Sequence, residues 1–334
     1  MSNQANYVAA AVATVGVLGG AYYAYQAYKA HQRHKIPKHW KQVGTLQHLF
    51  LYPVKSCGPA ILNKAECSAL GLRDGWLRDR VLVVVDSKNS FITARAHPEL
   101  LQINPTVKSA ILTLKHADYE PLHVNLAEVA ATQKPQTAVV WGATVPVYDC
   151  GWEASEWVSR IVDNSTTNYR LMYYATEKSR KIREKPVVKF YNLTKYDTGA
   201  FPDETSYNLI NHASVDDLNM RMKDAEASLL QFRPNFVLTG AKPYDEDNWK
   251  FLKIGDNIFE IIKPCTRCIL TTIDPETGVP DENGEPVKTL RTYRLDENPE
   301  IRKAAHNSPR MGLQIALRSD PGGLVSLNDP IYAA

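Results

Sequence analysis

Two cysteines three residues apart carry the most informative chemistry in this sequence: Cys265 and Cys268, followed by the largely β-branched run 269–273. A structural zinc site needs four ligands, and no second pair of cysteines with ligand spacing occurs in the chain. A redox-active CxxC pair lies at a helix N-terminus, whereas the run after Cys268 predicts a strand. A single thiolate presented to a soft metal is a third interpretation, with Arg267 nearby to favour the thiolate. On spacing alone, two buried structural cysteines are supported equally well, because free cysteines are often buried.

The segments around these cysteines predict short strands. Apolar, β-branched and aromatic residues gather in runs bounded by Pro, Gly and Asn, as in buried strands. A helix is predicted from Ser214, which starts a capping box, to about Met222. In the second half of the chain we predict strands at 232–238, 249–254, 259–262, 268–273 and 324–331.

The first half is also predicted to be rich in strands. Residues 80–86 and 91–94, joined by the turn 87–90, predict a hairpin. Asp149 is predicted to cap a helix over 153–162. Further strands are predicted at 45–52, 109–115, 122–126, 138–140 and 145–148, and the polar segment 180–197 is predicted to connect the two halves. Many short strands with few helices predict a mixed α+β fold with a β-barrel core.

The charge of the chain is unevenly distributed. The 334 residues carry a net charge of +3, and the first acidic residue is Glu66. Residues 1–41 contain five of the 39 Lys and Arg residues, so the rest of the chain is slightly acidic. A nucleic-acid-binding protein would carry its positive charge on the folded body, so we expect no nucleic-acid partner. Five cysteines, an odd number, argue against a disulfide scaffold and favour a reducing compartment.

The N-terminal segment from Tyr7 to Tyr28 contains no charged residue. Its length is close to the roughly 20 apolar residues that cross a bilayer as a helix. The basic residues follow the apolar run, which argues against a cleaved secretory signal, and no Arg precedes Arg33, which argues against a matrix presequence. We therefore predict an uncleaved anchor whose basic flank stays in the cytosol. Such anchors are typical of the mitochondrial outer membrane, with the endoplasmic reticulum and the peroxisome as alternatives.

Four sequence motifs occur between about Gly44 and the C-terminus. They are LYPVKSC at 51–57, LRDR at 77–80, FRPN at 232–235 and CTRCILTTIDPETG at 265–278. In type and order they resemble the MOSC family, and within it the amidoxime reducing components. The resemblance implies a transmembrane anchor and basic linker at 1–41, an N-terminal β-barrel-like α/β domain at 42–170, and a β-barrel MOSC domain at 171–334.

The family binds a pyranopterin–molybdenum cofactor, so the resemblance implies that Cys268 is the metal ligand and the catalytic residue. Further cofactor contacts are implied at Lys55, Ser56, Arg80, Thr205, Ser206, Arg233, Asn235, Thr266, Arg267 and Gln314. This set suits the ligand, because Arg, Lys and hydroxyl groups bind a phosphate and an amide matches a pterin edge. The chain departs from the family pattern at three places: Thr266 replaces Ser, Glu204 replaces Asp, and 311–314 reads MGLQ instead of Phe-Gly-x-Tyr.

The activity implied by the resemblance is reduction of small N-hydroxylated substrates, namely amidoximes, hydroxylamines and N-hydroxyguanidines. The resemblance also implies that electrons come from NADH through cytochrome b5 reductase and cytochrome b5. No haem or flavin motif occurs in the chain, which fits a terminal component that needs partners. The implied location is the mitochondrial outer membrane, with the catalytic domain facing the cytosol. The alternative is a carrier or sulfur-transfer protein for the cofactor, although a sulfurase would need a large domain in front and only about 40 residues precede Gly44.

Overall fold

The computed structural model describes residues 35–182, 189–194, 196–223 and 225–334. Residues 40–334 form one compact unit. The predicted membrane anchor lies outside the described residues. Within the described ranges, no helix combines the length and apolarity that a membrane crossing requires.

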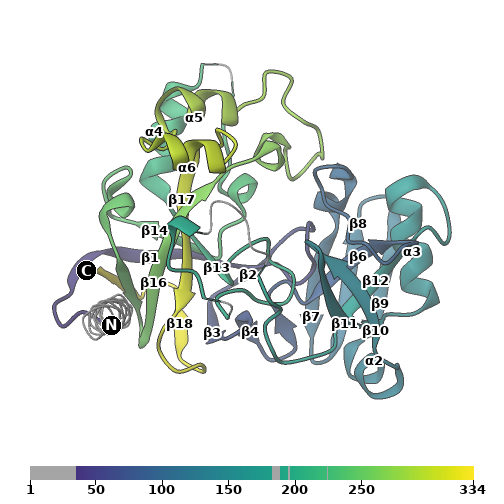
Figure 1. The fold of residues 1–334 in the computed structure, drawn as a ribbon. Helices are drawn as coiled ribbons and strands as arrows, with labels where there is room; N and C mark the ends of the chain where they lie inside the picture. Colours follow the sequence, from purple (N-terminus) through teal and green to yellow (C-terminus); the bar gives the residue numbers. More distant parts are fainter. Residues whose placement is uncertain (1–34, 183–188, 195, 224) are drawn as a thin grey trace, which may run out of the picture. The chain divides into compact units, whose positions relative to one another are not determined.

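The larger sheet of the unit closes into a barrel (Figure 1). Its strands follow the order β14-β13-β17-β16-β15-β19-β1, and β1 also pairs with β14, which closes the ring; β2 extends it beside β1. All pairs are antiparallel except β13 and β14, where Leu209 lies opposite Phe236. The strands are β1 (Lys41–Leu51), β2 (Ala60–Leu62), β13 (Tyr207–Asn211), β14 (Phe236–Thr239), β15 (Phe251–Ile254), β16 (Asn257–Thr266), β17 (Arg310–Leu317) and β19 (Pro330–Ala333).

An apolar core fills the barrel. Tyr207, Phe236 and Phe259 contact one another with ring centroids 5.2 to 5.8 Å apart, and all three are almost completely buried. A β-bulge in β1 shifts the register between Leu46 and His48, so that Leu46 and Leu49 are both buried. This bulge explains why the apolar residues of the segment do not alternate regularly.

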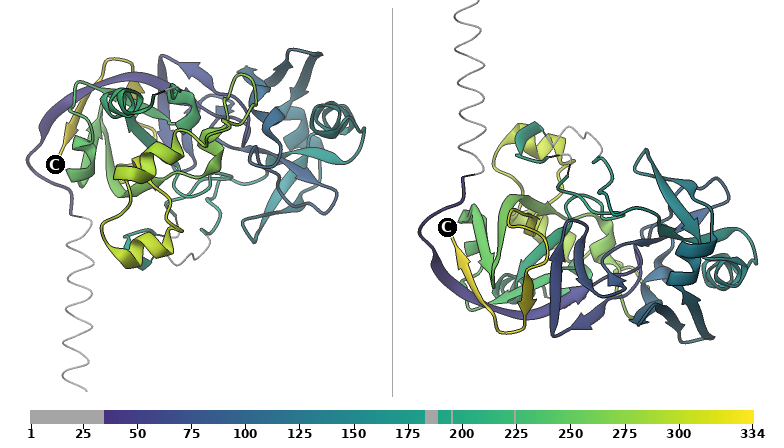
Figure 2. Two further views of the ribbon diagram at one scale, coloured as in Figure 1. Left: turned by 90° about the horizontal axis from the view of Figure 1, so that it is seen from above. Right: turned by 90° about the horizontal axis from the view of Figure 1, so that it is seen from below.

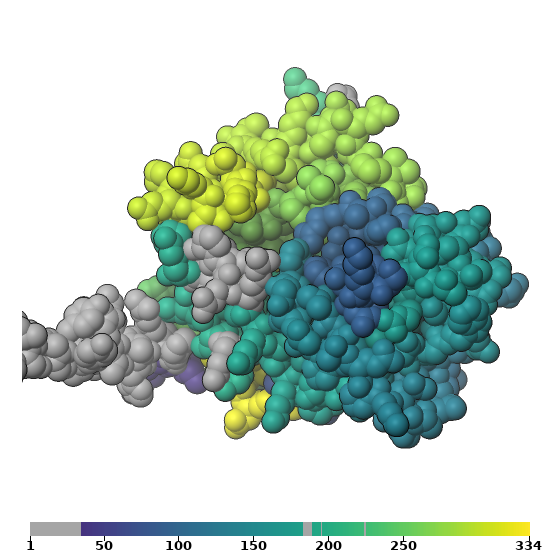
Figure 3. All heavy atoms as spheres, turned by 45° about the vertical axis from the view of Figure 1, so that its right-hand side comes forward, coloured from purple at the N-terminus to yellow at the C-terminus, as the bar shows by residue number. Residues whose placement is uncertain are grey.

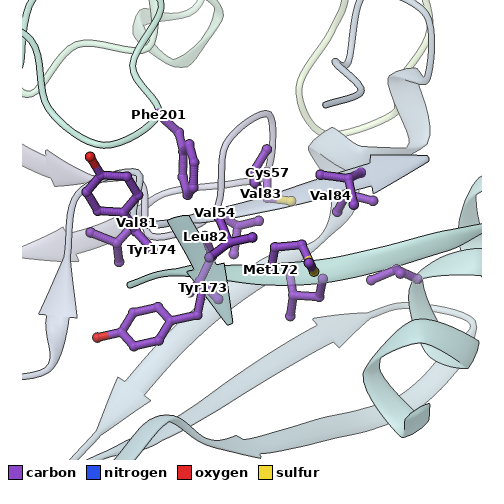
Figure 4. Packing of buried hydrophobic residues seen from close by; sticks show 14 of the residues in the cluster. Val54, Cys57, Val81, Leu82, Val83, Val84, Met172, Tyr173, Tyr174 and Phe201 are labelled. Atoms are coloured by element: carbon purple, nitrogen blue, oxygen red, sulfur yellow. The ribbon is translucent and has the colours of Figure 1, made fainter. Parts of the chain in front are cut away.

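The first half of the chain adds smaller antiparallel sheets (Figure 1, blue and teal). Their strands are β3 (Lys64–Ser68), β4 (Gly71–Asp74), β5 (Leu77–Arg78), β6 (Leu82–Asp86), β7 (Asn104–Lys108), β8 (Ile111–His116), β9 (Tyr119–Asn125), β10 (Gln136–Val140), β11 (Ala143–Asp149), β12 (Tyr169–Tyr174) and β18 (Leu324–Ser326). A second core lies among them, and Figure 4 shows Val83, Val84 and Met172 packed within it. The two halves exchange strands, since β1 belongs to the barrel and β18 pairs with β3.

Helices cover the edges of these sheets. The described α-helices are α2 (Leu126–Thr132), α3 (Trp152–Asp163), α4 (His212–Arg221), α5 (Val287–Tyr293) and α6 (Pro299–Ala304). Short 3-10 helices are η1 (Pro98–Gln102), η3 (Leu229–Phe232), η4 (Asp245–Asn248) and η5 (Ile269–Thr272). The views in Figure 2 show α3 against the sheets of the first half and α5 and α6 on the side of the barrel. The expected mixed α+β fold with a β-barrel is therefore confirmed.

Several local predictions were wrong. The single strand predicted over 324–331 forms two strands of different sheets, β18 and β19. The strand predicted over 232–238 begins only at Phe236, because helix η3 extends to Phe232. Residues 268–273 form helix η5 instead of a strand, because the hydroxyl groups of Thr271 and Thr272 donate to carbonyl oxygens three residues earlier, at 2.9 and 2.8 Å. Residues 91–94 make only an isolated bridge from Phe91 to the strand β6. Helix α4 is capped by Asn211 and not by Ser214, and α3 begins after Gly151, whose amide donates to the Asp149 carboxylate.

Candidate functional site

A cavity of about 250 Å³ collects residues from both halves of the chain. On the face shown in Figure 3, the green and yellow side chains of the second half adjoin the blue and teal side chains of the first. Ser206, one of the residues expected to bind cofactor, does not line the cavity; it is buried and its Oγ donates to the carbonyl oxygen of Ala69 at 3.3 Å. The other expected residues all line it: Lys55, Ser56, Arg80, Thr205, Arg233, Asn235, Thr266, Arg267, Cys268 and Gln314.

Cys268 lies where strand β16 ends and helix η5 begins, and its side chain is partly exposed. The guanidinium Nη1 of Arg95 lies 3.6 Å from its Sγ and donates to it. Arg95 comes from the loop after β6, so the first half of the chain supplies a cation to the sulfur that the second half presents. The sulfur therefore lines the cavity with a cationic group beside it.

Cys265 differs from Cys268 in burial and partner. It is 5% exposed and lies within β16, where its Sγ accepts a hydrogen bond from Gln314 Nε2 at 3.2 Å. Gln314 Oε1 accepts from the backbone amide of Thr205 at 3.2 Å and from its hydroxyl group. Gln314 thus joins β17 to the segment before β13 and holds Cys265 in place. Both cysteines are free thiols.

Two arginines in the cavity wall have guanidinium nitrogens for which the described part of the chain offers no hydrogen-bond partner. Arg267 donates through Nε to the carbonyl oxygen of Met311 and through Nη1 to that of Phe232, both at 2.8 Å. Its Nη2 is buried and has no hydrogen-bond partner among the described residues, and the same holds for Nη2 of Arg233. Burial lowers the pKa of Arg233, although a guanidinium stays charged in proteins. A buried donor on a cation is costly to leave unpaired, so these two nitrogens favour an anionic ligand.

The backbone beneath the cavity adopts uncommon conformations. Ser56, Arg80 and Arg233 have φ of 71°, 47° and 50°, in the left-handed region that side-chain-bearing residues rarely occupy. The guanidinium groups of Arg80 and Arg233 lie 4.7 and 4.3 Å from the ring centroid of buried Tyr52. Gly312 has φ of 75°, and a Cβ there would lie 3.2 Å from Arg267 Nη2. Backbone strain of this kind is concentrated at ligand-binding sites.

Asn235 is completely buried, and its amide is occupied by the protein. Its Nδ2 donates to Asp79 Oδ1 at 3.0 Å and to the carbonyl oxygen of Phe50 at 3.1 Å. Its Oδ1 accepts from the backbone amide of Asn208 at 3.2 Å, while Asp79 Oδ2 pairs with Arg80 Nη1 at 2.5 Å. The geometry therefore makes Asn235 a support for Arg80, in addition to its position in the cavity wall.

The sequence did not predict three further charged and aromatic side chains that line the cavity, Arg95, Trp141 and Asp203. Asp203 forms an ion pair with Lys55 Nζ and accepts from Trp141 Nε1 at 3.1 Å. Arg95 lies over the Trp141 ring, 5.2 Å from its centroid. Burial lowers the pKa of Lys55 to about 8, against the opposing effect of Asp203. These residues follow no periodic pattern; the only signal was that Asp203 and Glu204 directly precede Thr205.

The charge of the cavity matches an anionic group. Five cationic side chains line it against two carboxylates, Asp203 and Glu204. Lys55 is already paired with Asp203, and Glu204 is paired with buried Lys263. The excess positive charge, the two unpaired Nη2 atoms and one accessible sulfur together fit a ligand with a phosphate, a planar polar ring system and a thiophilic metal.

A second hollow of about 510 Å³ lies next to this cavity and shares Gln231 with it. Of the residues that the structure describes, five carboxylates line it and no Lys or Arg does. Asp274 and Asp281 accept hydrogen bonds from nearby backbone amides, at 2.7 to 3.1 Å, so they stabilise the local turns. In the ranges that the structure describes, no three His, Cys, Asp or Glu side chains are grouped as ligands of a metal ion.

Two family matches cover most of the chain. The family described as MOSC N-terminal beta barrel domain matches residues 43–165, and the family described as MOSC domain matches residues 197–332. Residues from both matched segments line the cavity. These matches define the class of protein to which the fold and the site belong.

Named relatives narrow the class. A Bos taurus protein named mitochondrial amidoxime reducing component 2 is 35% identical over 292 residues, which is 87% of this chain and 84% of the relative. Proteins named mitochondrial amidoxime-reducing component 1 from Mus musculus and Homo sapiens are 35% and 34% identical, over 87% of this chain and 83% of each relative. The chain belongs to the MOSC-domain family of the mitochondrial amidoxime reducing components.

Proposed function

We propose that this protein is a molybdenum-dependent reductase of N-hydroxylated compounds, with its cofactor in the cavity around Cys268. One observation carries the proposal: an accessible sulfur lines a cationic cavity in which Arg233 and Arg267 each keep a buried nitrogen that has no partner among the described residues. The names of the relatives supply the reaction, because they describe amidoxime reduction.

The residues present would share the work of holding the cofactor. Arg233 and Arg267 offer donors to its phosphate or pterin oxygens, and Arg80, Lys55 and Ser56 border the same space. Additional cavity residues with hydrogen-bonding groups are Thr205, Asn235, Thr266 and Gln314. Cys268 Sγ would be the protein's ligand to the metal. Arg95 would keep a positive charge beside that sulfur.

When bound, the cofactor would supply the two electrons that, with two protons, convert an amidoxime to an amidine and water. The protein's contribution is to position and to select. The partly exposed side of Cys268 leaves access from the cavity, while buried Cys265 is fixed by Gln314 and takes no part in binding the metal. Electrons would come from NADH through cytochrome b5 reductase and cytochrome b5.

The proposed location is the mitochondrial outer membrane, with residues 40–334 in the cytosol. The relatives are named mitochondrial proteins, and the apolar run 7–28 with its basic flank supports an uncleaved anchor. Removing residues 1–39 should release a folded protein from membranes, because residues 40–334 form their own compact unit. A truncated protein that still sediments with membranes would contradict the anchor.

The function is tested by NADH oxidation with benzamidoxime as substrate, in the presence of purified cytochrome b5 and its reductase. We expect benzamidine to form in proportion to NADH consumed, and no turnover when this protein is omitted. Molybdenum-containing protein without turnover, with substrate and electron donors in excess, would overturn the reductase and favour a carrier of the cofactor.

A further inference from the structure

We propose that Asp203 anchors the substrate, so that the site selects N-hydroxylated amidines and guanidines over N-hydroxy compounds without a neighbouring amino group. This inference rests on the proposed function and adds a specificity-determining residue to it. It concerns a carboxylate that lines the same cavity as the cofactor-binding arginines and for which the sequence itself predicted no role.

The two oxygens of Asp203 have different surroundings. Oδ1 is held by Lys55 Nζ and by Trp141 Nε1, which donates at 3.1 Å. No donor in the described part of the chain lies within hydrogen-bond distance of Oδ2; Arg95 Nη1 is 3.8 Å away. The side chain is 41% exposed and lines the cavity. Oδ2 therefore keeps acceptor capacity for a ligand, while Oδ1 fixes the orientation of the carboxylate.

Arg95 lies between this oxygen and the sulfur of Cys268, and its contacts limit how far apart the two atoms can be. The same Nη1 atom that is 3.8 Å from Asp203 Oδ2 is 3.6 Å from Cys268 Sγ. The oxygen and the sulfur are therefore no farther apart than these two distances laid end to end, which a small molecule can span. A ligand bound to Oδ2 would lie beside the sulfur that we assign to the metal.

The carboxylate remains ionised, which decides the kind of group that it binds. Burial alone would raise the pKa of Asp203, but Lys55 and Arg95 outweigh this effect and lower it. An ionised carboxylate accepts hydrogen bonds and donates none, so its ligand must present N–H or O–H donors. Amidoximes and N-hydroxyguanidines carry an amino group on the carbon next to the reacting nitrogen, and simple oximes do not.

The carboxylate would also favour the reaction. An amidoxime is neutral, but the amidine that remains after loss of water takes up a proton and becomes a cation. Its N–H groups can then pair with Asp203, so the interaction strengthens as the product forms. Interactions that strengthen along the reaction lower its barrier. Lys55 and Arg95 offset part of this attraction and thereby allow the product to leave.

Binding of benzamidine to the purified holoenzyme tests the inference. We compare the unchanged protein with Asp203→Asn, which keeps the shape of the side chain and removes its charge. The matched control is Glu282→Gln, which removes the same charge from the neighbouring acidic hollow, outside the cavity. Isothermal titration gives the dissociation constant separately from the number of competent sites, so partial cofactor loss in a variant does not alter the affinity measured.

We expect Asp203→Asn to weaken benzamidine binding about 10- to 100-fold, as for loss of a charge-assisted hydrogen bond. Glu282→Gln should leave the affinity within about 2-fold, because exposed charges outside the cavity are screened. In Asp203→Asn, reduction of benzamidoxime should show a higher KM and a lower kcat. Reduction of benzaldoxime, which has no amino group, should change much less. Unchanged benzamidine affinity in Asp203→Asn, while the unchanged protein still reduces benzamidoxime, would overturn this inference alone. Absence of benzamidoxime reduction by the unchanged protein would overturn the proposed function.

Discussion

The two neighbouring hollows of this protein differ in the charge of their side chains and in whether those side chains already have hydrogen-bond partners. The acidic hollow has a volume of about 510 Å³ and the cavity around Cys268 about 250 Å³. Five carboxylates line the acidic hollow among the described residues. Yet Asp274 and Asp281 accept hydrogen bonds from backbone amides of their own turns, and Glu282 is exposed. In the smaller cavity, Arg233 and Arg267 keep buried nitrogens that no described residue satisfies. Unsatisfied buried charge, and neither volume nor total charge, indicates where a ligand is required.

The largest expected effect separates the two cysteines of the smaller cavity. Cys268→Ala should abolish amidoxime reduction, because the metal loses its protein ligand. Cys265→Ser should keep most activity, because a hydroxyl can still accept from Gln314 Nε2, at a cost of about 1 kcal/mol in stability. Turnover and molybdenum content of both variants are measured with electron donors in excess. Equal loss of activity in the two would contradict a single-ligand site and support a dithiol.

A smaller effect is expected at the buried cations. Arg233→Ala should lower molybdenum occupancy about 10-fold or more, because a charge-assisted contact is lost. The melting temperature of the cofactor-free variant should fall by no more than a few degrees, since the change removes a buried Nη2 that has no described hydrogen-bond partner and leaves only the contact with the Tyr52 ring to be lost. Glu282→Gln serves as the control in the acidic hollow and should retain full occupancy. Full occupancy in Arg233→Ala would remove that arginine from the cofactor site.

The smallest effect is a pH dependence of stability from Lys55. Burial lowers its pKa from 10.5 to about 8, so between these values the unfolded chain binds more protons than the folded one. Stability relative to Lys55→Met should therefore rise with pH across this window, by at most about 3 kcal/mol. Denaturant titrations of cofactor-free protein at several pH values give this difference. A difference that does not change with pH would show that Lys55 is not desolvated.

The sequence could predict much of the site because its motifs place charged residues at fixed points of the chain. FRPN and CTRC brought Arg233, Arg267 and Cys268 to one cavity as expected. Arg95 and Trp141 could not be found in this way, because neither belongs to one of the four motifs. Both lie in loops of the first half, after β6 and β10, and only the folded structure brings them to the cavity. Asp203 lay beside an expected residue, but its two ion-pair partners come from distant segments.

The fold was predicted at the level of class and less well locally. Apolar runs indicated most strands of the barrel sheet, but β2, β13 and β17, the last of which carries Gln314, were not predicted. The β-branched run after Cys268 favoured a strand, and hydrogen bonds from Thr271 and Thr272 to the backbone made it a 3-10 helix. This difference matters for the site, because β16 ends at Thr266 and helix η5 begins directly after Cys268, which leaves Cys268 between the two elements.

The central claim is that the smaller cavity holds a molybdenum cofactor through Cys268. Elemental analysis of the purified full chain, produced in cells that make the cofactor, tests it most directly. We expect stoichiometric molybdenum, a pterin released on denaturation, and loss of the metal or of its sulfur coordination in Cys268→Ala. Protein that contains no molybdenum, or that contains stoichiometric zinc lost equally in Cys265→Ser and Cys268→Ala, would contradict the account.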